Sequence, residues 1–194
     1  SLMSGLTQAT AGLDFAVKNQ NAKTIGIISD NGGLGKELAA NAQKLAATLG
    51  IKVVSVQEFQ VGATDMTPQL LSLRQAKPDV VLHTGSVPKD GGTLIQNLRE
   101  IKWTPTIVSM MFGQSTVQVV NVSGPDSFTS GTYWGLVPKA FTYCASEKVG
   151  SRTYDRYLAK LKAFNPGAFD KIDHKVALYV YDPIFVWKTA VEGA

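Results

Sequence analysis

Cysteine and histidine are nearly absent from this chain of 194 residues. Cys144 is the single cysteine, which excludes an internal disulfide and any cysteine-rich metal site. His83 and His174 are the only histidines, so a metal centre would need carboxylate ligands, and no spacing of Asp and Glu residues pairs them suitably. We therefore expect neither a metal nor another cofactor.

Long apolar runs and clusters of one charge are missing as well. No stretch approaches the roughly 20 apolar residues that a membrane-spanning helix needs, and the N-terminus lacks the charged and then apolar pattern of a signal peptide. The net charge is +4, but the basic residues are scattered and gather at most in pairs. The pattern indicates a solvated surface, and nucleic-acid binding is not expected.

The residues that are present predict an α/β fold. The chain is 44% hydrophobic and long enough to bury one core, and short apolar strands alternate with amphipathic helices. This alternation is typical of a mostly parallel sheet with helices on both faces, which makes a three-layer, Rossmann-like α-β-α arrangement. The expected strands are residues 24–29, 52–59, 80–84, 106–110 and 132–137, and the expected helices are residues 3–19, 38–49, 68–77, 92–101, 115–122 and 146–164.

A glycine-rich loop at residues 30–35 follows the first strand and opens a helix, so it is the first candidate for a ligand site. A dinucleotide fingerprint would need glycine where Leu38 stands, and a phosphate-binding P-loop would need other residues where Asp30 and Glu37 stand. A Rossmann-like enzyme that binds a nucleotide through Gly33 and Gly35 stays open as an alternative. A tight turn without a ligand stays open too.

Catalytic motifs are missing. Ser29 and Ser86 end strands, but neither lies in a G-x-S-x-G elbow, and neither histidine has the sequence context of a catalytic triad. His83 ends an apolar strand, and a partly buried core histidine is favoured there over a ligand contact. We predict that the chain is not an enzyme.

Two segments resemble the periplasmic solute-binding proteins of the branched-chain amino-acid (Leu, Ile, Val) type. Residues 23–39, KTIGIISDNGGLGKELA, are similar to the strand, Asp-x-x-x-Tyr-Gly, helix pattern that opens the second lobe of those proteins. Residues 62–81 resemble that family's G-x-x-D-x-[ST]…L…P-D-V-V signature in order and spacing. The likeness extends from about residue 7 to residue 194. It implies the second, C-terminal lobe of a type I periplasmic binding protein that serves an ABC importer.

The resemblance also implies where a ligand binds. In that family, loops after three neighbouring strands form one face of a cleft, which closes when two lobes hinge together. Leu34 stands where the family commonly has a tyrosine, and the loop at residues 111–113 lacks the acid that often binds the ammonium of an amino acid. Because an unpaired buried charge is costly, the expected ligand is an amino acid held differently, or an acid, keto acid or aromatic compound without an amine. The implied ligand-binding residues are Asn31, Gly32, Gly33, Leu34, Thr84, Gly85, Ser86, Met111 and Phe112.

Domain organisation, partners and location follow from the same resemblance. Residues 1–172 are expected to form the ligand-binding lobe, and residues 173–194 a crossover helix that packs in a first lobe. A signal peptide and that first lobe would precede this segment in a periplasmic protein, whose partners are the ligand and an ABC permease. Without the first lobe, the apolar crossover helix should be buried in a homodimer or over the cleft face. A ligand-sensing lobe of a membrane receptor shares this fold and stays open as well.

Overall fold

The computed structural model describes residues 4–110, 116–128, 133–135, 151–169 and 191–192. The chain divides into two compact units. One is Met3–Leu136, and the other is made of Val137–Ala194 with Ser1–Leu2. Each unit is described by itself.

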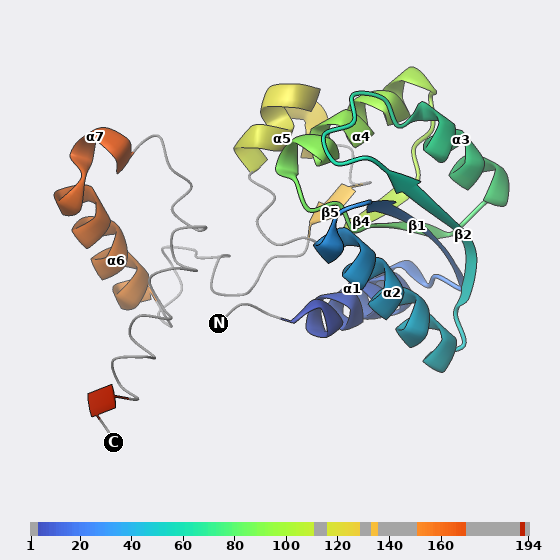
Figure 1. Cartoon of the computed structure of the whole chain (residues 1–194), viewed down its shortest axis with the longest axis horizontal. Helices are drawn as coiled ribbons and strands as arrows, with labels where there is room; N and C mark the ends of the chain where they lie inside the picture. Colours follow the sequence, from blue (N-terminus) through green and yellow to red (C-terminus); the bar gives the residue numbers. More distant parts are fainter. Residues whose placement is uncertain (1–3, 111–115, 129–132, 136–150, 170–190, 193–194) are drawn as a thin grey trace. The chain divides into compact units, whose positions relative to one another are not determined.

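The larger unit is built on a parallel sheet of five strands in the order β2-β1-β3-β4-β5 (Figure 1). All residues of β1 after Thr24 are buried, as expected for a central strand. The predicted parallel five-stranded sheet is confirmed, and so is the position of the second strand at an edge. The strands are β1 (Thr24–Asp30), β2 (Lys52–Phe59), β3 (Val80–His83), β4 (Thr106–Ser109) and β5 (Tyr133–Gly135).

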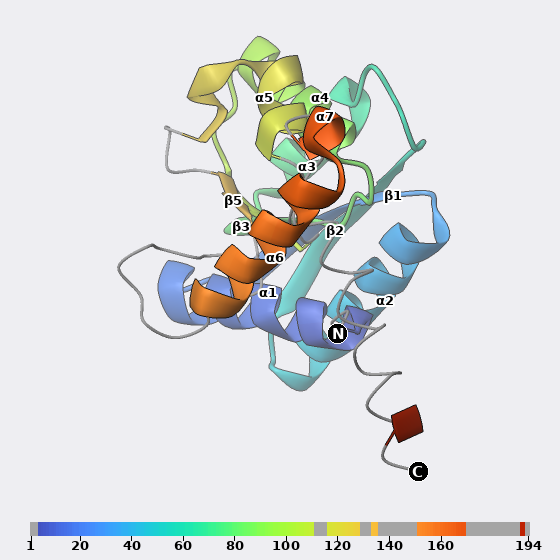
Figure 2. The ribbon, with the colours of Figure 1, turned by 90° about the vertical axis from the view of Figure 1, so that its left-hand side faces the viewer.

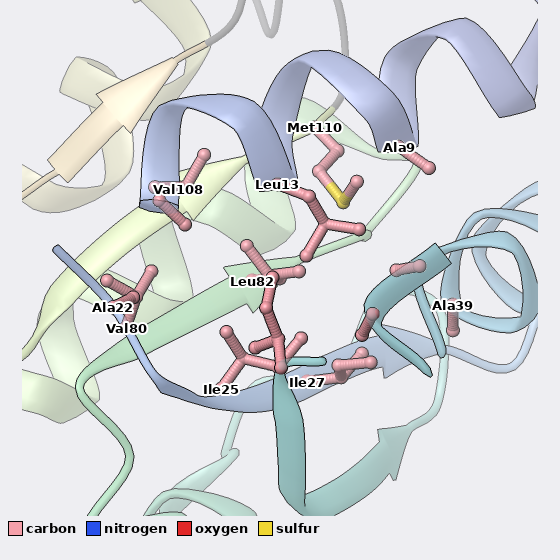
Figure 3. Packing of buried hydrophobic residues seen from close by; sticks show 14 residues of the cluster. Ala9, Leu13, Ala22, Ile25, Ile27, Ala39, Val80, Leu82, Val108 and Met110 are labelled. Carbon is pink, nitrogen blue, oxygen red and sulfur yellow. The ribbon is translucent and has the colours of Figure 1, made fainter. Parts of the chain in front are cut away.

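Helices cover both faces of this sheet (Figure 2). On one face lie α1 (Gly5–Gln20) and α2 (Gly33–Thr48), whose small side chains pack against Ile27 and Leu82 of the strands (Figure 3). On the other face, Ile28 packs with apolar side chains of three further helices. These are α3 (Thr67–Ala76), α4 (Pro88–Glu100) and α5 (Thr116–Ser123), and a short 3-10 helix η1 (Pro125–Phe128) follows them.

The helix α4 begins four residues before the predicted start at residue 92. Pro88 fits the first turn of a helix, where its missing N–H costs nothing, so the proline starts the helix instead of delaying it. This earlier start brings Asp90 into the first turn of α4, where its side chain is fully buried.

The signature at residues 62–81 contains two aspartates, and both accept hydrogen bonds from backbone N–H groups. Asp65 accepts a hydrogen bond from the Thr67 backbone N–H at 2.8 Å and so satisfies the first N–H of α3 from the residue before the N-cap, Met66. Asp79 accepts from the N–H groups of Lys23 and Thr24, at 2.9 and 2.8 Å, and joins the start of β1 to that of β3. In this chain, therefore, both acidic positions of the signature organise the backbone.

In the smaller unit, α6 (Ser151–Phe164) leads into the single turn α7 (Pro166–Phe169). The Lys162 ammonium lies 5.7 Å from the centre of the Phe169 ring, within the range of a cation–π contact. Residues 170–190, most of the predicted crossover helix, fall outside the described part of the chain. Its burial against another surface stays a prediction. Within the described residues, no helix has the length and apolar character to cross a membrane.

Candidate functional site

The site predicted from the sequence lies at the carboxyl end of the sheet, between β1 and β3. The strand order 2-1-3 means that the chain leaves β1 and β3 in opposite directions, to α2 on one face and α4 on the other. Ligands of open α/β sheets bind at such a switch point, in the crevice outside the carboxyl ends of the strands. The loops after β1 and β3 are therefore the first surfaces to consider.

Asp30, the last residue of β1, connects these two loops. Its side chain is fully buried, and its Oδ1 accepts a hydrogen bond from the Gly32 N–H at 2.9 Å. Its Oδ2 accepts from both the backbone N–H and the Oγ hydroxyl of Ser86. Both carboxylate oxygens are thus used to hold the loop after β3 against the loop after β1.

Thr84 makes a second connection between the same loops. Its side chain is fully buried, and its hydroxyl donates to the Gly35 carbonyl oxygen at 3.2 Å. Its backbone N–H donates to the Ile28 carbonyl oxygen at 2.9 Å. The predicted ligand residue Thr84 is therefore buried, and its hydroxyl holds the loop after β3 to the first turn of α2.

His83 supports the loop after β3 from inside the core. The ring is fully buried and stacks on Phe59 with 6.2 Å between the ring centres. Its Nδ1 lies 3.4 Å from the hydroxyl oxygens of Ser109 and Tyr133. Burial lowers the pKa of His83 to about 4, although the nearby charge of Asp30 acts to raise it, so the ring is neutral at pH 7. The interpretation of His83 as a core histidine is confirmed.

Position 85 must be a glycine because the buried ring of His83 leaves no room for a side chain there. A Cβ at Gly85 would lie 2.4 Å from His83 Nε2 and 3.1 Å from the tip of the Phe59 ring. No side chain fits there without moving two aromatic rings out of a packed core. The backbone of the loop therefore lies directly on the imidazole.

The loop after β2 joins the same end of the sheet. The Asn31 side-chain oxygen accepts from the Val61 N–H at 3.0 Å, and the Asn31 N–H donates to the Phe59 carbonyl oxygen at 2.9 Å. Asp90 accepts from the Gly62 N–H at 3.2 Å through one oxygen, while burial raises the pKa of this carboxyl group. Its other oxygen is buried and has no hydrogen-bond partner among the described residues.

Two apolar side chains are exposed at these loops. Leu34, in the first turn of α2, is 40% exposed, and Val61 is 41% exposed. A methyl group of Val61 lies 3.4 Å from where a Cβ of Gly32 would be, so this valine flanks the glycine loop. Sequence reasoning missed Val61 because a single valine in a turn carries no signal of its surroundings.

The structure thus brings most of the predicted site residues to one end of the sheet. Ser86 is bonded to Asp30 beside Gly32, and Gly33 and Leu34 open α2, which no side chain caps and whose first turn holds no acid. Met111 and Phe112 lie outside the described residues.

A hollow of about 660 Å³ in the described part of the chain lies elsewhere, beside Trp103 and Pro105 at the amino end of β4. None of the predicted ligand residues is among the described residues that line it. The candidate site at the switch point is therefore separate from this hollow. In the described residues, no three His, Cys, Asp or Glu side chains gather as a metal would require.

Similar proteins agree with this architecture. The family model for periplasmic binding proteins matches residues 4–194, whereas no curated protein matches the chain. A leucine-binding protein, LivK, from Thermotoga maritima is 19% identical with a TM-score of 0.64, over 80% of this chain and 43% of that one. LivJ from Streptococcus pneumoniae, solved with isoleucine, is 14% identical with a TM-score of 0.66, over 84% and 44%. A fatty acid ABC transporter substrate-binding protein from Thermomonospora curvata is 15% identical with a TM-score of 0.65, over 85% and 41%.

The chain spans less than half the length of these three structures. At such low identity, the likeness shows the fold of a binding-protein lobe. The family model, in contrast, covers nearly the whole chain. The chain therefore belongs to the periplasmic binding protein family, a non-catalytic family.

Proposed function

We propose that this chain is the second, C-terminal lobe of a type I solute-binding protein of the branched-chain amino-acid type. It binds a small molecule in a cleft against a first lobe and delivers it to the permease of an ABC importer, in the periplasm. The observation that supports this most is the joining of three loops at the switch point through Asp30, Asn31 and Thr84. Such a surface is preorganised, so that it can bind a ligand without a rearrangement of its loops.

The ligand class follows from the side chains and hydrogen-bond donors that these loops leave available to a ligand. Leu34 and Val61 present apolar surface, whereas the donors of Ser86 are engaged by Asp30. We infer an amino acid or a related small carboxylic or aromatic compound, whose apolar portion faces Leu34. The isoleucine bound to LivJ and the fatty acids after which the Thermomonospora curvata protein is named are both molecules of this amphipathic kind.

A nucleotide is disfavoured at the glycine loop. The Gly32 N–H, which a phosphate would need, already donates to the Asp30 carboxylate, and that negative charge would repel a phosphate. The interpretation of the chain as a Rossmann-like enzyme therefore has less support than its interpretation as a binding protein.

Calorimetric titration of the full-length gene product tests the function. The panel holds isoleucine, leucine, valine, hexanoate and benzoate, with NAD and ATP as the competing class. We expect binding heat with at least one of the first five and none with the nucleotides. Saturable binding of NAD or ATP alone would overturn the assignment.

A further inference from the structure

We propose that Asp30 is a positioning residue, which fixes the loop after β3 to the loop after β1 so that the two form one unit before a ligand arrives. Its role toward a ligand rests on the proposed function, whereas the bond between the loops does not. The residue itself is fully buried and so does not contact a ligand.

The geometry of the carboxylate makes this bond strong. Asp30 and Ser86 are 56 positions apart in sequence, yet the Oδ2 atom accepts two hydrogen bonds from Ser86 while Oδ1 accepts from Gly32. Neither ion pair found in the described residues involves Asp30. A buried carboxylate without a cation depends on such neutral donors, so opening the loops would leave its charge unsatisfied.

A glycine makes room for this carboxylate. A Cβ at Gly35 would lie 2.1 Å from Asp30 Oδ1 and 2.9 Å from its backbone oxygen. The Gly35 carbonyl oxygen also accepts the Thr84 hydroxyl. Gly35 is thus needed for close approach at the point where the two loops meet, and the first turn of α2 is built around Asp30.

The bond changes the role expected of Ser86. Its N–H and its hydroxyl hydrogen both point to Asp30, so neither is free to donate to a ligand. Replacing Ser86 should therefore weaken ligand binding by loosening the loops. A ligand-donor role for Ser86 predicts the opposite pattern, in which the loops stay coupled and only binding is lost.

Hydrogen exchange on this chain tests the bond without a ligand. Asp79→Asn is the matched control, because Asp79 also accepts two backbone N–H groups but at the amino end of the sheet. We expect Asp30→Asn to speed exchange about tenfold or more at residues 31–36 and 84–90, with little change in Asp79→Asn. Equal loss of protection throughout the sheet, or none in the two loops, would overturn the positioning role.

Ser86→Ala keeps the experiment decisive if Asp30→Asn does not fold. This variant removes one hydroxyl and leaves the backbone bond to Asp30. Faster exchange at residues 31–36, on the other loop, supports the coupling, whereas a change confined to residues 84–90 refutes it. Where both variants fold, the double variant should exchange no faster than Asp30→Asn alone, since both act on one contact.

Affinity gives the functional readout in the full-length gene product, measured with isoleucine or whichever panel compound binds the wild type. Asp30→Asn should weaken binding about tenfold or more, and Asp79→Asn should not. If the wild type binds no compound, the proposed function fails while the exchange data still decide the bond. If wild type and Asp30→Asn bind equally well, the positioning role is wrong and the function stands.

Discussion

The two ends of the sheet use the same chemical group for different purposes. At the amino end, Asp79 is exposed and joins β1 to β3 through two backbone N–H groups. At the carboxyl end, Asp30 is fully buried and joins two loops that lead to opposite faces of the sheet. Water can replace the partners of an exposed carboxylate but not those of a buried one. The carboxyl end is therefore the more rigidly specified end, in agreement with the binding surface that we propose there.

The largest expected difference between the ends concerns binding. Leu34→Asp places a charge on the apolar surface of the proposed site and should abolish ligand binding in the full-length gene product. Leu49→Asp changes a leucine that is more exposed than Leu34 and follows the other end of α2, and it should leave affinity unchanged. Titration calorimetry compares the two. Unchanged affinity in Leu34→Asp would show that this side chain faces away from the ligand.

The second prediction concerns the pH at which groups at each end of the sheet change the stability of the fold. The pKa of His83 is about 4 in the fold against an ordinary 6.5, so the unfolded chain binds more protons between these values. Stability should therefore fall as pH drops from 6.5 to 4, by about 3 kcal/mol in all. The raised pKa of Asp90 acts in the opposite direction at the acid end of this window. Urea unfolding at several pH values measures the slope.

His83→Gln is the control for that slope, because it keeps a neutral polar side chain that cannot titrate. The fall in stability between pH 6.5 and 4 should flatten in this variant. At the amino end, the stability contributed by Asp79 should be lost only at lower pH, since hydrogen bonds from Lys23 and Thr24 lower the pKa of Asp79 below its ordinary 3.8. An unaltered slope in His83→Gln would mean that other groups carry the acid sensitivity.

The third prediction compares two glycines at the carboxyl end. Gly35→Ala inserts a methyl group against Asp30 and should destabilise the fold by about 1–3 kcal/mol. Gly33→Ala meets nothing within 4 Å and should be neutral or stabilising by up to about 1 kcal/mol. Thermal unfolding of both variants checks this. Similar stabilities would show that the carboxylate of Asp30 moves aside easily.

The smallest effect is expected at the amino end. Asp79→Asn weakens two hydrogen bonds to an exposed carboxylate, and we expect a loss below about 1 kcal/mol at neutral pH. Urea unfolding measures it beside the other variants. A loss as large as that of Gly35→Ala would remove the contrast between exposed and buried aspartates.

Most of the fold could be predicted because its signals are local. Apolar runs marked the strands, and turn residues marked their ends. The start of α4 could not be placed, because Pro88 ends an extended segment in one context and begins a helix in another. Choosing between these requires the packing of Asp90 and the residues after it, which lies outside any local pattern.

The positions of the loops that make up the proposed site were predictable, but the hydrogen bonds within and between them were not. Glycines after a buried strand indicated the loop, yet nothing in the sequence pairs Asp30 with Ser86, which meet only because Ile28 is in register with His83. The sequence predicts Ser86 as a ligand-binding residue, whereas in the structure its hydroxyl donates to Asp30. Polar groups at the ends of strands can bind a ligand or one another, and the register of the strands in the sheet determines which of the two occurs.

The bond from Asp30 to Ser86 also has a consequence for how the larger unit unfolds. It connects the loop that enters α2 to the loop that enters α4, and these helices bury separate hydrophobic clusters on opposite faces of the sheet. If either helical layer separates from the sheet, the hydrogen bonds from Ser86 to Asp30 break and both loops lose their connection. The two layers are therefore expected to melt together, in a single cooperative transition.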